Sequence, residues 1–232
     1  MKRALIILFS FFVFHLYGQQ DTTFYDNNWG IVSSLNKAEY YKIVQTLDSD
    51  TIKTTYYKSG IMKSKSFSLK YQEWYESGTL KTDIDLNNKK YNGKLLTFWE
   101  NGVPKRIDTY KENKFIEGKC FDNLGNEIEY FDYRIPAQFP GGEANLVKYV
   151  SKKLRYPIAA INKGIEGRVI VKFVINKKGI PTRIQIEKSV SHELDKEAMR
   201  VIKSMPKWKP GKVDGEIVDV WYTLPFVFIL PY

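Results

Sequence analysis

Few residues of this chain have the chemistry of an enzyme. His192 is one of only two histidines, and the other, His15, lies in an apolar run at the N-terminus. No second histidine follows His192 at helical spacing, so the pattern differs from that of a zinc metalloprotease. Glu193 and Glu197 lie one helical turn apart among basic neighbours. This favours a solvated helix face over a catalytic carboxylate pair.

Other signatures of catalysis are missing from the sequence. No Gly-x-Ser-x-Gly nucleophile elbow and no glycine-rich phosphate loop occur. Cys120 is the single cysteine, so the chain cannot form an internal disulfide. We interpret Cys120 as a small buried hydrophobe in a strand. We therefore expect no enzyme activity, no catalytic residue, no cofactor and no metal site.

The most informative stretch lies near the C-terminus, where the chemistry would be binding. Apolar side chains occupy both faces of the predicted strand, with Val220, Tyr222 and Leu224 on one face and Trp221 on the other. Pro225 has no backbone N–H, so it fits an edge strand or a bulge. An edge strand exposes unpaired backbone groups, onto which a peptide can add as a further strand. We expect the strand from Val218 to Leu224 to be such an edge.

The elements that position this strand precede it. Pro157 suits the first turn of a short helix over residues 158–163, and Gly164 ends it. From residue 168 the apolar period is two, which predicts a strand, a turn over residues 176–179 and a return strand. Helical spacing then follows until Pro206, in Leu194, Ala198, Val201, Ile202 and Met205. The order predicts an α+β fold, with a small antiparallel sheet and helices on one face.

Several short motifs in this region occur together in the order of a known family. They are Phe139-Pro140-Gly141-Gly142-Glu143, Tyr156-Pro157, Gly164-Ile165-Glu166-Gly167-Arg168-Val169, Pro206-Lys207-Trp208-Lys209-Pro210-Gly211 and Tyr222-Thr223-Leu224-Pro225. In these motifs residues 136–230 resemble the C-terminal domain of TonB-family energy transducers, in the form common in Bacteroidetes. The first motif is interpreted as a loop that enters a helix.

The resemblance implies a binding function. In this family the last strand pairs with a short extended peptide, the TonB box of an outer-membrane transporter, and the region beside the Tyr-Pro pair is also implicated. The partner-binding residues implied here are Tyr156, Pro157, Val218, Asp219, Val220, Trp221, Tyr222, Thr223 and Leu224. The alternative is that Tyr156, Trp208 and Trp221 are core aromatics, and for Trp208 we favour core packing.

The resemblance also implies energy transduction for transmembrane transport, with the inner-membrane ExbB–ExbD motor as a partner. The sequence departs from a full transducer, however. The usual N-terminal membrane helix would be longer, and the 9 prolines of this chain do not cluster into a linker. The peptide-binding module is therefore better supported than the transducing role.

The N-terminus has the pattern of an export signal. Three residues with two basic side chains precede a nearly unbroken apolar run from Ala4 to Tyr17, and Gly18 is a small residue at the end. This predicts a Sec signal peptide over residues 1–18 and a periplasmic location. The alternative is an inner-membrane anchor that leaves the chain facing the periplasm, although a spanning helix needs about 20 apolar residues.

The net charge of +10 is compatible with an acidic partner or surface. A cell-wall polymer such as peptidoglycan is one candidate, and a solvated soluble surface is the alternative. The export signal disfavours nucleic acid as a partner.

A repeat fills most of the region between signal and C-terminal domain. Its copies are Tyr57-Lys58-Ser59-Gly60-Ile61-Met62-Lys63, Tyr75-Glu76-Ser77-Gly78-Thr79-Leu80-Lys81 and Trp99-Glu100-Asn101-Gly102-Val103-Pro104-Lys105, with a decayed copy at 121–128. Aromatics before a Ser-Gly or Asn-Gly turn predict β-hairpins stacked in one layer. The copies resemble MORN-type repeats, in the variant of YwqK-like antitoxin proteins.

The expected domains are therefore a signal peptide over 1–18, an all-β hairpin-repeat region over 19–133 and a TonB-like domain over 134–232. One functional alternative remains open. The chain could be an envelope adaptor or structural protein that binds through its repeats without energy transduction.

The N-terminal pattern gives the first testable prediction. We expect the mature protein to begin at or near Gln19 and to be released by osmotic shock, because the apolar run is short and ends in a small residue. N-terminal sequencing of the released protein checks this. An intact Met1 in a membrane pellet that resists carbonate washing would contradict it and favour the anchored form.

Overall fold

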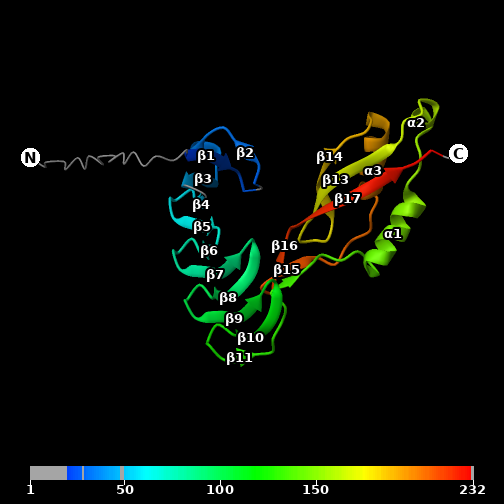
Figure 1. The fold of residues 1–232 in the computed structure, drawn as a ribbon. Coiled ribbons are helices and arrows are strands. Elements are labelled where there is room, and N and C mark those ends of the chain that lie inside the picture. Colours follow the sequence, from blue (N-terminus) through cyan, green and yellow to red (C-terminus); the bar gives the residue numbers. More distant parts are fainter. Residues whose placement is uncertain (1–19, 28, 48–49, 231–232) are drawn as a thin grey trace, which may run out of the picture. The chain divides into compact units, whose positions relative to one another are not determined.

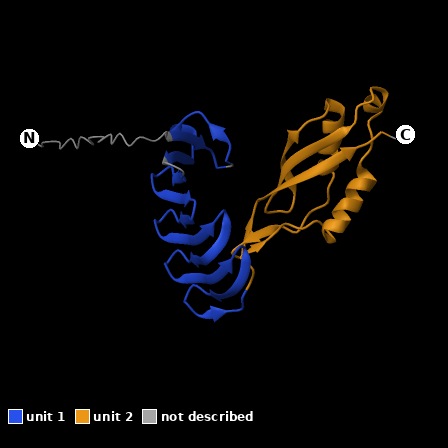
Figure 2. Ribbon diagram, in the orientation of Figure 1, with its two compact units in different colours: residues 1–130 blue, residues 131–232 orange. Residues whose placement is uncertain are grey.

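The structure is a computed structural model of the 232-residue chain, and it describes residues 20–27, 29–47 and 50–230 (Figure 1). The expected signal peptide lies outside the described residues. The chain divides into two compact units, residues 1–130 and 131–232 (Figure 2). The sequence predicted this boundary at Tyr133. No helix in the described ranges has the length and apolar content needed to cross a bilayer.

The first unit is an antiparallel sheet of 11 strands in the order β11-β10-β9-β8-β7-β6-β5-β4-β3-β1-β2. From β3 onward each strand pairs with its neighbour in the chain, so the sheet grows hairpin by hairpin. Its elements are β1 (Gln20–Tyr25), β2 (Ile31–Val32), the 3-10 helix η1 (Leu35–Lys37), β3 (Tyr40–Leu47), β4 (Asp50–Tyr57), β5 (Met62–Phe67), β6 (Lys70–Trp74), β7 (Leu80–Asn87), β8 (Lys90–Phe98), β9 (Pro104–Lys111), β10 (Lys114–Phe121) and β11 (Glu127–Ile128).

The sequence repeat corresponds to one turn, which closes every second hairpin. In the β6–β7 hairpin the N–H of Tyr75 donates to the carbonyl of Thr79, and the N–H of Gly78 donates to the carbonyl of Tyr75, both at 2.9 Å. Gly78 has a φ of +86°, which only glycine adopts without strain. In the last hairpin Asp122 replaces the aromatic residue, and its carboxylate accepts hydrogen bonds from two N–H groups of the turn.

The aromatic residue of each turn also links its repeat to the next. The tyrosine hydroxyl or the tryptophan indole N–H donates to a backbone carbonyl of the following repeat. These hydrogen bonds run from Tyr57 to Trp74, from Tyr75 to Phe98 and from Trp99 to Phe121, at 2.9–3.1 Å. The lysine six residues later lies over the same ring, at 4.7 Å for Lys63, 5.3 Å for Lys81 and 4.5 Å for Lys105. The pattern aromatic-x-x-Gly-x-x-Lys thus combines a turn, an inter-repeat hydrogen bond and a cation–π contact.

The last hairpins bury an ion pair. Arg106 and Asp108 lie 2.9 Å apart, and both side chains are fully buried. The hydroxyl of Tyr130 donates to Asp108 at 3.3 Å, and burial together with the Asp108 charge raises the pKa of Tyr130. Gly118 faces Asp108 across the β9–β10 pair, where a Cβ would come within 2.2 Å of Asp108 Oδ1. Cys120 on the same strand is fully buried, as predicted.

The second unit has an α+β fold with mostly antiparallel pairing, as predicted. Its two three-stranded sheets have the orders β14-β13-β17 and β12-β15-β16. Its elements are β12 (Arg134–Ile135), α1 (Gly142–Lys153), α2 (Ile158–Asn162), β13 (Gly167–Ile175), β14 (Pro181–Lys188), α3 (His192–Lys203), β15 (Gly211–Val213), β16 (Glu216–Val218) and β17 (Val220–Phe228).

The core of this unit lies between the β14-β13-β17 sheet and the three helices. The sheet contributes alternate residues of β13 and β17, namely Val169, Val171, Phe173, Ile175, Phe226 and Phe228. The helices contribute Leu146 from α1, Ala160 from α2, and Leu194, Ala198, Val201 and Ile202 from α3. All three helices therefore pack against one face of the sheet. The period of two along the strands and the helical period along α3 produce this arrangement.

One feature adds to the sequence expectations and another differs from them. The motif at 139–143 predicts entry into a helix but not its extent, because α1 fully buries only Leu146 and so has a weak apolar period. The strand predicted from Val218 begins at Val220 instead. Val218 pairs with Gly211 in the β15–β16 hairpin. Asp219 connects the two strands, and its carboxylate lies 2.6 Å from the guanidinium of Arg183.

The buried ion pair generates the second prediction. We expect Gly118→Ala to destabilise β9 and β10 by about 2–4 kcal/mol, because the added methyl group would displace Asp108 from Arg106. Hydrogen exchange of the β9 and β10 amides measures this. The matched control is Gly102→Ala, where nothing lies within 4 Å of the added Cβ and the positive φ alone costs about 1 kcal/mol. Equal losses in both variants would contradict the proposed clash.

Candidate functional site

Strand β17 forms one edge of its sheet. It pairs with β13 along its whole length, and no other described strand pairs with it. Pro225 faces Ile170 in this pairing. Because proline has no N–H, it fits here with its nitrogen directed to the free edge. The alternation of antiparallel pairing then directs the backbone groups of Trp221 and Thr223 to the same edge.

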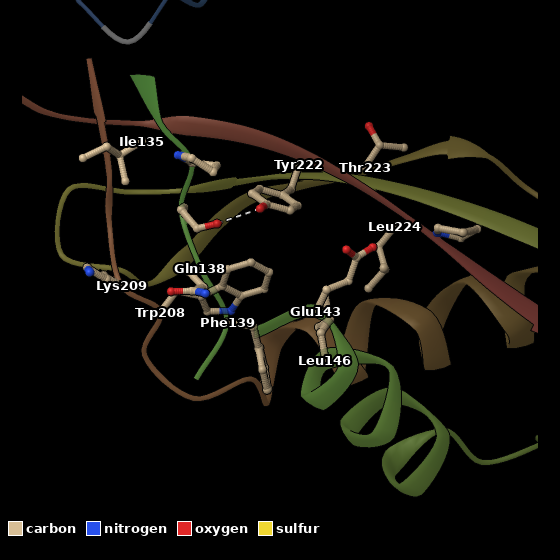
Figure 3. Close-up of a pocket in the computed structure, with 13 residues that line it drawn as sticks. Ile135, Gln138, Phe139, Glu143, Leu146, Trp208, Lys209, Tyr222, Thr223 and Leu224 are labelled. Atoms are coloured by element: carbon tan, nitrogen blue, oxygen red, sulfur yellow. Dashed lines mark hydrogen bonds between the residues drawn. The ribbon is translucent and has the colours of Figure 1, made fainter. Parts of the chain in front are cut away.

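A groove with a volume of about 540 Å³ lies along this part of β17 (Figure 3). Four segments of the second unit build it: the strand itself, residues 135–139, the first turns of α1 and residues 208–209. The lining residues are Ile135, Pro136, Ala137, Gln138, Phe139, Glu143, Leu146, Trp208, Lys209, Tyr222, Thr223, Leu224 and Pro225. Most of them are apolar, as in ligand pockets generally.

Trp208 joins the walls of the groove. It is only 2% exposed, and its ring packs edge-on against Phe139 at 5.4 Å and against Tyr222 at 4.9 Å. Beside it the backbones of Gln138 and Lys209 exchange two hydrogen bonds of 2.8–2.9 Å. Trp208 Nε1 is buried and has no hydrogen-bond acceptor among the described residues. The predicted core packing of Trp208 is confirmed, and the groove wall contains an unmatched donor.

Tyr222 connects the strand to the same wall. Its hydroxyl donates to the carbonyl of Ala137 at 2.7 Å (Figure 3). Burial raises the pKa of Tyr222, and the charge of Glu143 raises it further. Tyr222 therefore remains a neutral donor at physiological pH, and the carboxylate of Glu143 acts electrostatically within the groove.

Two consecutive glycines turn the chain from one wall into the other. Gly141 and Gly142 have φ values of +79° and +82°, and the N–H of Gly142 donates to the carbonyl of Phe139 at 2.7 Å. A Cβ on Gly141 would meet the side chain of Asn145 at 1.8 Å. The turn starts α1 at Gly142 and so places Glu143 on the groove. This explains the glycine pair in the helix-entry motif.

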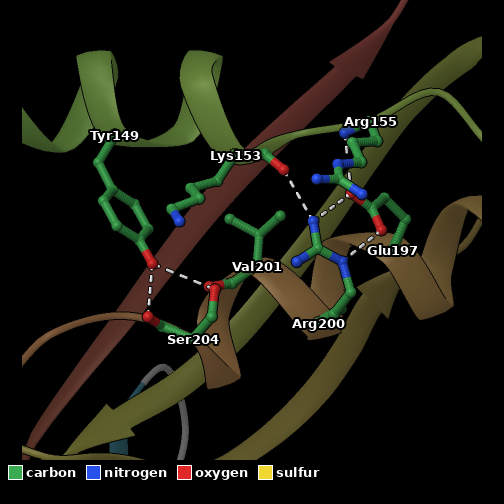
Figure 4. Close-up of polar contacts among 7 residues, drawn as sticks. All are labelled: Tyr149, Lys153, Arg155, Glu197, Arg200, Val201 and Ser204. Carbon is green, nitrogen blue, oxygen red and sulfur yellow. Dashed lines mark hydrogen bonds and ion pairs between the residues drawn. The ribbon is translucent and has the colours of Figure 1, made fainter.

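The other end of α1 is fixed to α3 by Glu197 (Figure 4). Its carboxylate accepts the N–H of Arg155 at 2.8 Å and two hydrogen bonds from Arg200 at 2.7 Å. Arg200 also donates to the carbonyl of Lys153, at the last turn of α1. Burial alone would raise the pKa of Glu197, but the hydrogen bonds from Arg200 and Arg155 outweigh it and lower the pKa.

A second contact supports the same junction. The hydroxyl of Tyr149 donates to the carbonyl of Ser204 just beyond α3 (Figure 4). The C-terminal part of α1 is thereby held against α3, while its first turn forms one wall of the groove.

The nine partner-binding residues implied by the sequence do not form one site. Tyr222, Thr223 and Leu224 line the groove, whereas the remaining six do not. Tyr156 packs its ring against Phe228 at 5.6 Å and donates to the carbonyl of Ile165. It therefore behaves largely as a core residue.

Two further implied residues lie on other surfaces. Pro157 precedes α2 and lines a separate cavity of about 360 Å³ with His192, Glu193, Lys196, Glu197 and Arg200. Trp221 is 47% exposed, on the sheet face opposite the helices, and it stacks with Lys172 at 4.9 Å. The reading of Trp221 as a core aromatic is wrong.

The sequence did not assign Phe139, Glu143, Leu146 and Lys209 to the site. Phe139, Glu143 and Lys209 belong to the two Gly- and Pro-containing motifs at 139–143 and 206–211, which the structure brings to one groove. Leu146 lies outside both motifs. Within the described ranges, no cluster of His, Cys, Asp and Glu side chains could hold a metal ion.

Comparison with known proteins found similarity within the second unit. Residues 152–230 match the family described as Gram-negative bacterial TonB protein C-terminal. The protein tonB2 of Pseudomonas aeruginosa is 33% identical over 78 residues, which are 32% of this chain and 28% of that protein. The chain thus spans little more than a quarter of that relative.

Solved structures of similar sequence are also known. Two solution structures of the Helicobacter pylori TonB C-terminal domain are 31% and 30% identical to this chain. The matched regions are 38% and 40% of this chain, and 94% and 88% of the two solved chains. The TM-scores are 0.30 and 0.31.

The junction of α1 and α3 generates the third prediction. We expect Glu197→Gln to destabilise the second unit by about 1 kcal/mol at neutral pH, because the charged hydrogen bonds are weakened. The folded pKa of Glu197 lies below its ordinary value of 4.5. Its contribution is therefore fully present above that value and is lost as the pH falls through the folded pKa.

The measurement is urea unfolding of wild type and variant at neutral pH and at steps below pH 4.5, followed by the indole N–H resonance of Trp208. The stability difference between the two proteins should shrink as the pH falls. A difference that stays constant with pH would show that the pKa of Glu197 is not lowered.

Proposed function

Residues 152–230 form a TonB-type C-terminal domain, and on this premise we propose that the second unit binds an extended peptide by strand addition to β17. The observation that carries the proposal is the free edge of β17 beside the groove. A peptide strand added at Thr223 would lie along the groove opening. Its backbone would pair with the strand, and alternate side chains would enter the groove.

The dimensions fit this mode of binding. The volume of about 540 Å³ lies within the range of about 300–1,000 Å³ that is common for ligand sites. Backbone pairing supplies affinity for many sequences, and the apolar lining from Phe139, Leu146 and Leu224 supplies side-chain contacts.

We infer that the peptide belongs to an outer-membrane transporter and that binding takes place in the periplasm. The family of the domain supports this partner. A role in energising transport with the ExbB–ExbD motor would follow if the N-terminal apolar run anchors the chain. We further propose that the hairpin repeats, which resemble MORN-type repeats, space this domain from an anchor or from other partners in the envelope.

The fourth prediction tests the edge of β17. We expect Thr223→Pro to weaken peptide binding by at least tenfold, because it removes a backbone N–H at the free edge. Thr223→Ala is the matched control, since it shortens the same side chain and keeps the N–H, and it should bind nearly as the wild type does. Isothermal titration with periplasm-facing N-terminal peptides of co-expressed outer-membrane transporters measures both.

Folding is checked for each variant by the dispersion of its amide resonances. Undiminished binding by a folded Thr223→Pro variant would exclude this edge. It would direct attention to the Tyr156–Pro157 surface or to the hairpin repeats.

A further inference from the structure

The groove has opposite charges at its two ends. Among its lining residues Glu143 is the one carboxylate and Lys209 the one ammonium group. Figure 3 shows Lys209 on the side of Ile135, and Glu143 on the side of Leu146 and Leu224. The charges are thus separated along the direction of β17, with apolar side chains between them.

Both charges are available to a ligand. The two side chains are exposed at the rim, and neither forms a hydrogen bond or an ion pair with another described residue. The charge of Glu143 still acts inside the groove, where it raises the pKa of Tyr222 in addition to burial. Two other surface carboxylates of this unit do have cationic partners: Glu193 lies 2.7 Å from Lys163, and Asp219 lies 2.6 Å from Arg183.

A strand added to an edge can run in either direction, because backbone groups pair in parallel and in antiparallel arrangements. An apolar groove distinguishes the two directions poorly. Charges at the rim of an interface contribute little affinity, but they select register and orientation by complementarity and by repulsion. A pair of opposite charges along β17 would therefore give the groove a polarity.

We propose that Glu143 and Lys209 set the direction and the charge order of the bound peptide. The ligand is an extended peptide with an acidic side chain beside Lys209 and a basic side chain beside Glu143. The lining part of β17 runs from Tyr222 to Pro225, about 10 Å at the rise of a strand, so the two charges of the peptide lie about three or four residues apart. This inference rests on the proposed strand addition and specifies its ligand.

Glu143 also lies in the first turn of α1, where a carboxylate stabilises the helix through its dipole. That role would explain a glutamate here without any ligand. It would not explain a reversal of the peptide's direction when the order of its two charges is reversed. The test therefore compares the directions of bound peptides and not stabilities.

The experiment uses two ten-residue peptides of alternating Thr and Val, which differ only in the order of one Asp and one Lys placed four residues apart. Binding to the full chain is measured by the shift of the Trp208 indole N–H resonance, assigned with Trp208→Phe, and the direction of the bound peptide by the line broadening that a nitroxide at its N-terminus causes. In the wild type the label of the Asp-first peptide should broaden the amides near Lys209 and the label of the Lys-first peptide the amides near Glu143, and this selectivity should fall at high salt. The double variant Glu143→Lys with Lys209→Glu should exchange the two directions at unchanged net charge.

The outcomes separate this inference from the proposed function. The same label position for both peptides, or in the wild type and the double variant, with loss of binding in Thr223→Pro, would overturn the polarity and leave strand addition intact. Binding of neither peptide, nor of any transporter peptide, would overturn the proposed function itself. Glu187→Gln on β14, a charge change at the other edge of the sheet, should leave both peptide directions unaltered. A change of direction in this control would show that net charge decides the direction and would overturn the inference.

Discussion

Trp208 packs edge-on against Phe139 and Tyr222, and this buried aromatic contact joins the segments on which the groove depends. The indole lies between residues 135–139 and strand β17, two segments that are far apart in sequence. The paired backbones of Gln138 and Lys209 keep these segments in register. Without the ring, an apolar cavity would separate the walls, and loss of a buried tryptophan typically costs about 3–5 kcal/mol. The unmatched Nε1 shows that packing, rather than a hydrogen bond of the ring, holds the indole of Trp208 in place.

Helix α1 combines a fixed end with an end that borders the groove. Its C-terminal turn is bound to α3 through Glu197 and Arg200, while its first turn follows a two-glycine turn and contributes Glu143. Leu146 is the one fully buried residue of the helix, and Tyr149 and Val150 pack against the core although only partly buried, so the position of the helix depends on these side chains together with the polar contacts. A groove wall built in this way can keep its charged rim exposed and still have a defined orientation.

The two units differ in how far apart in sequence their contacting residues lie. In the first unit, pairing from β3 onward joins neighbours in sequence, and the same turn, inter-repeat hydrogen bond and lysine–aromatic contact recur from Tyr57 to Lys105. Its local contacts make it predictable from a short motif. In the second unit, β17 pairs with β13 about fifty residues earlier in the chain, and the core collects residues from all three helices. Such long-range contacts are required before the groove can exist.

Elements with local signals could be predicted from the amino-acid sequence. Pro157 and Gly164 bound the short helix, Pro206 follows the end of the last helix, the period of two defines β13, and Pro225 marks β17 as an edge. Each of these depends on backbone preferences or side-chain alternation within a few residues. Folding in three dimensions was needed to see that Tyr156 packs against the core, that Val218 belongs to another hairpin, and that Glu143, Trp208 and Lys209 meet at the same groove as Thr223. A groove is made by side chains from segments distant in sequence, and their packing leaves no periodic pattern along the chain.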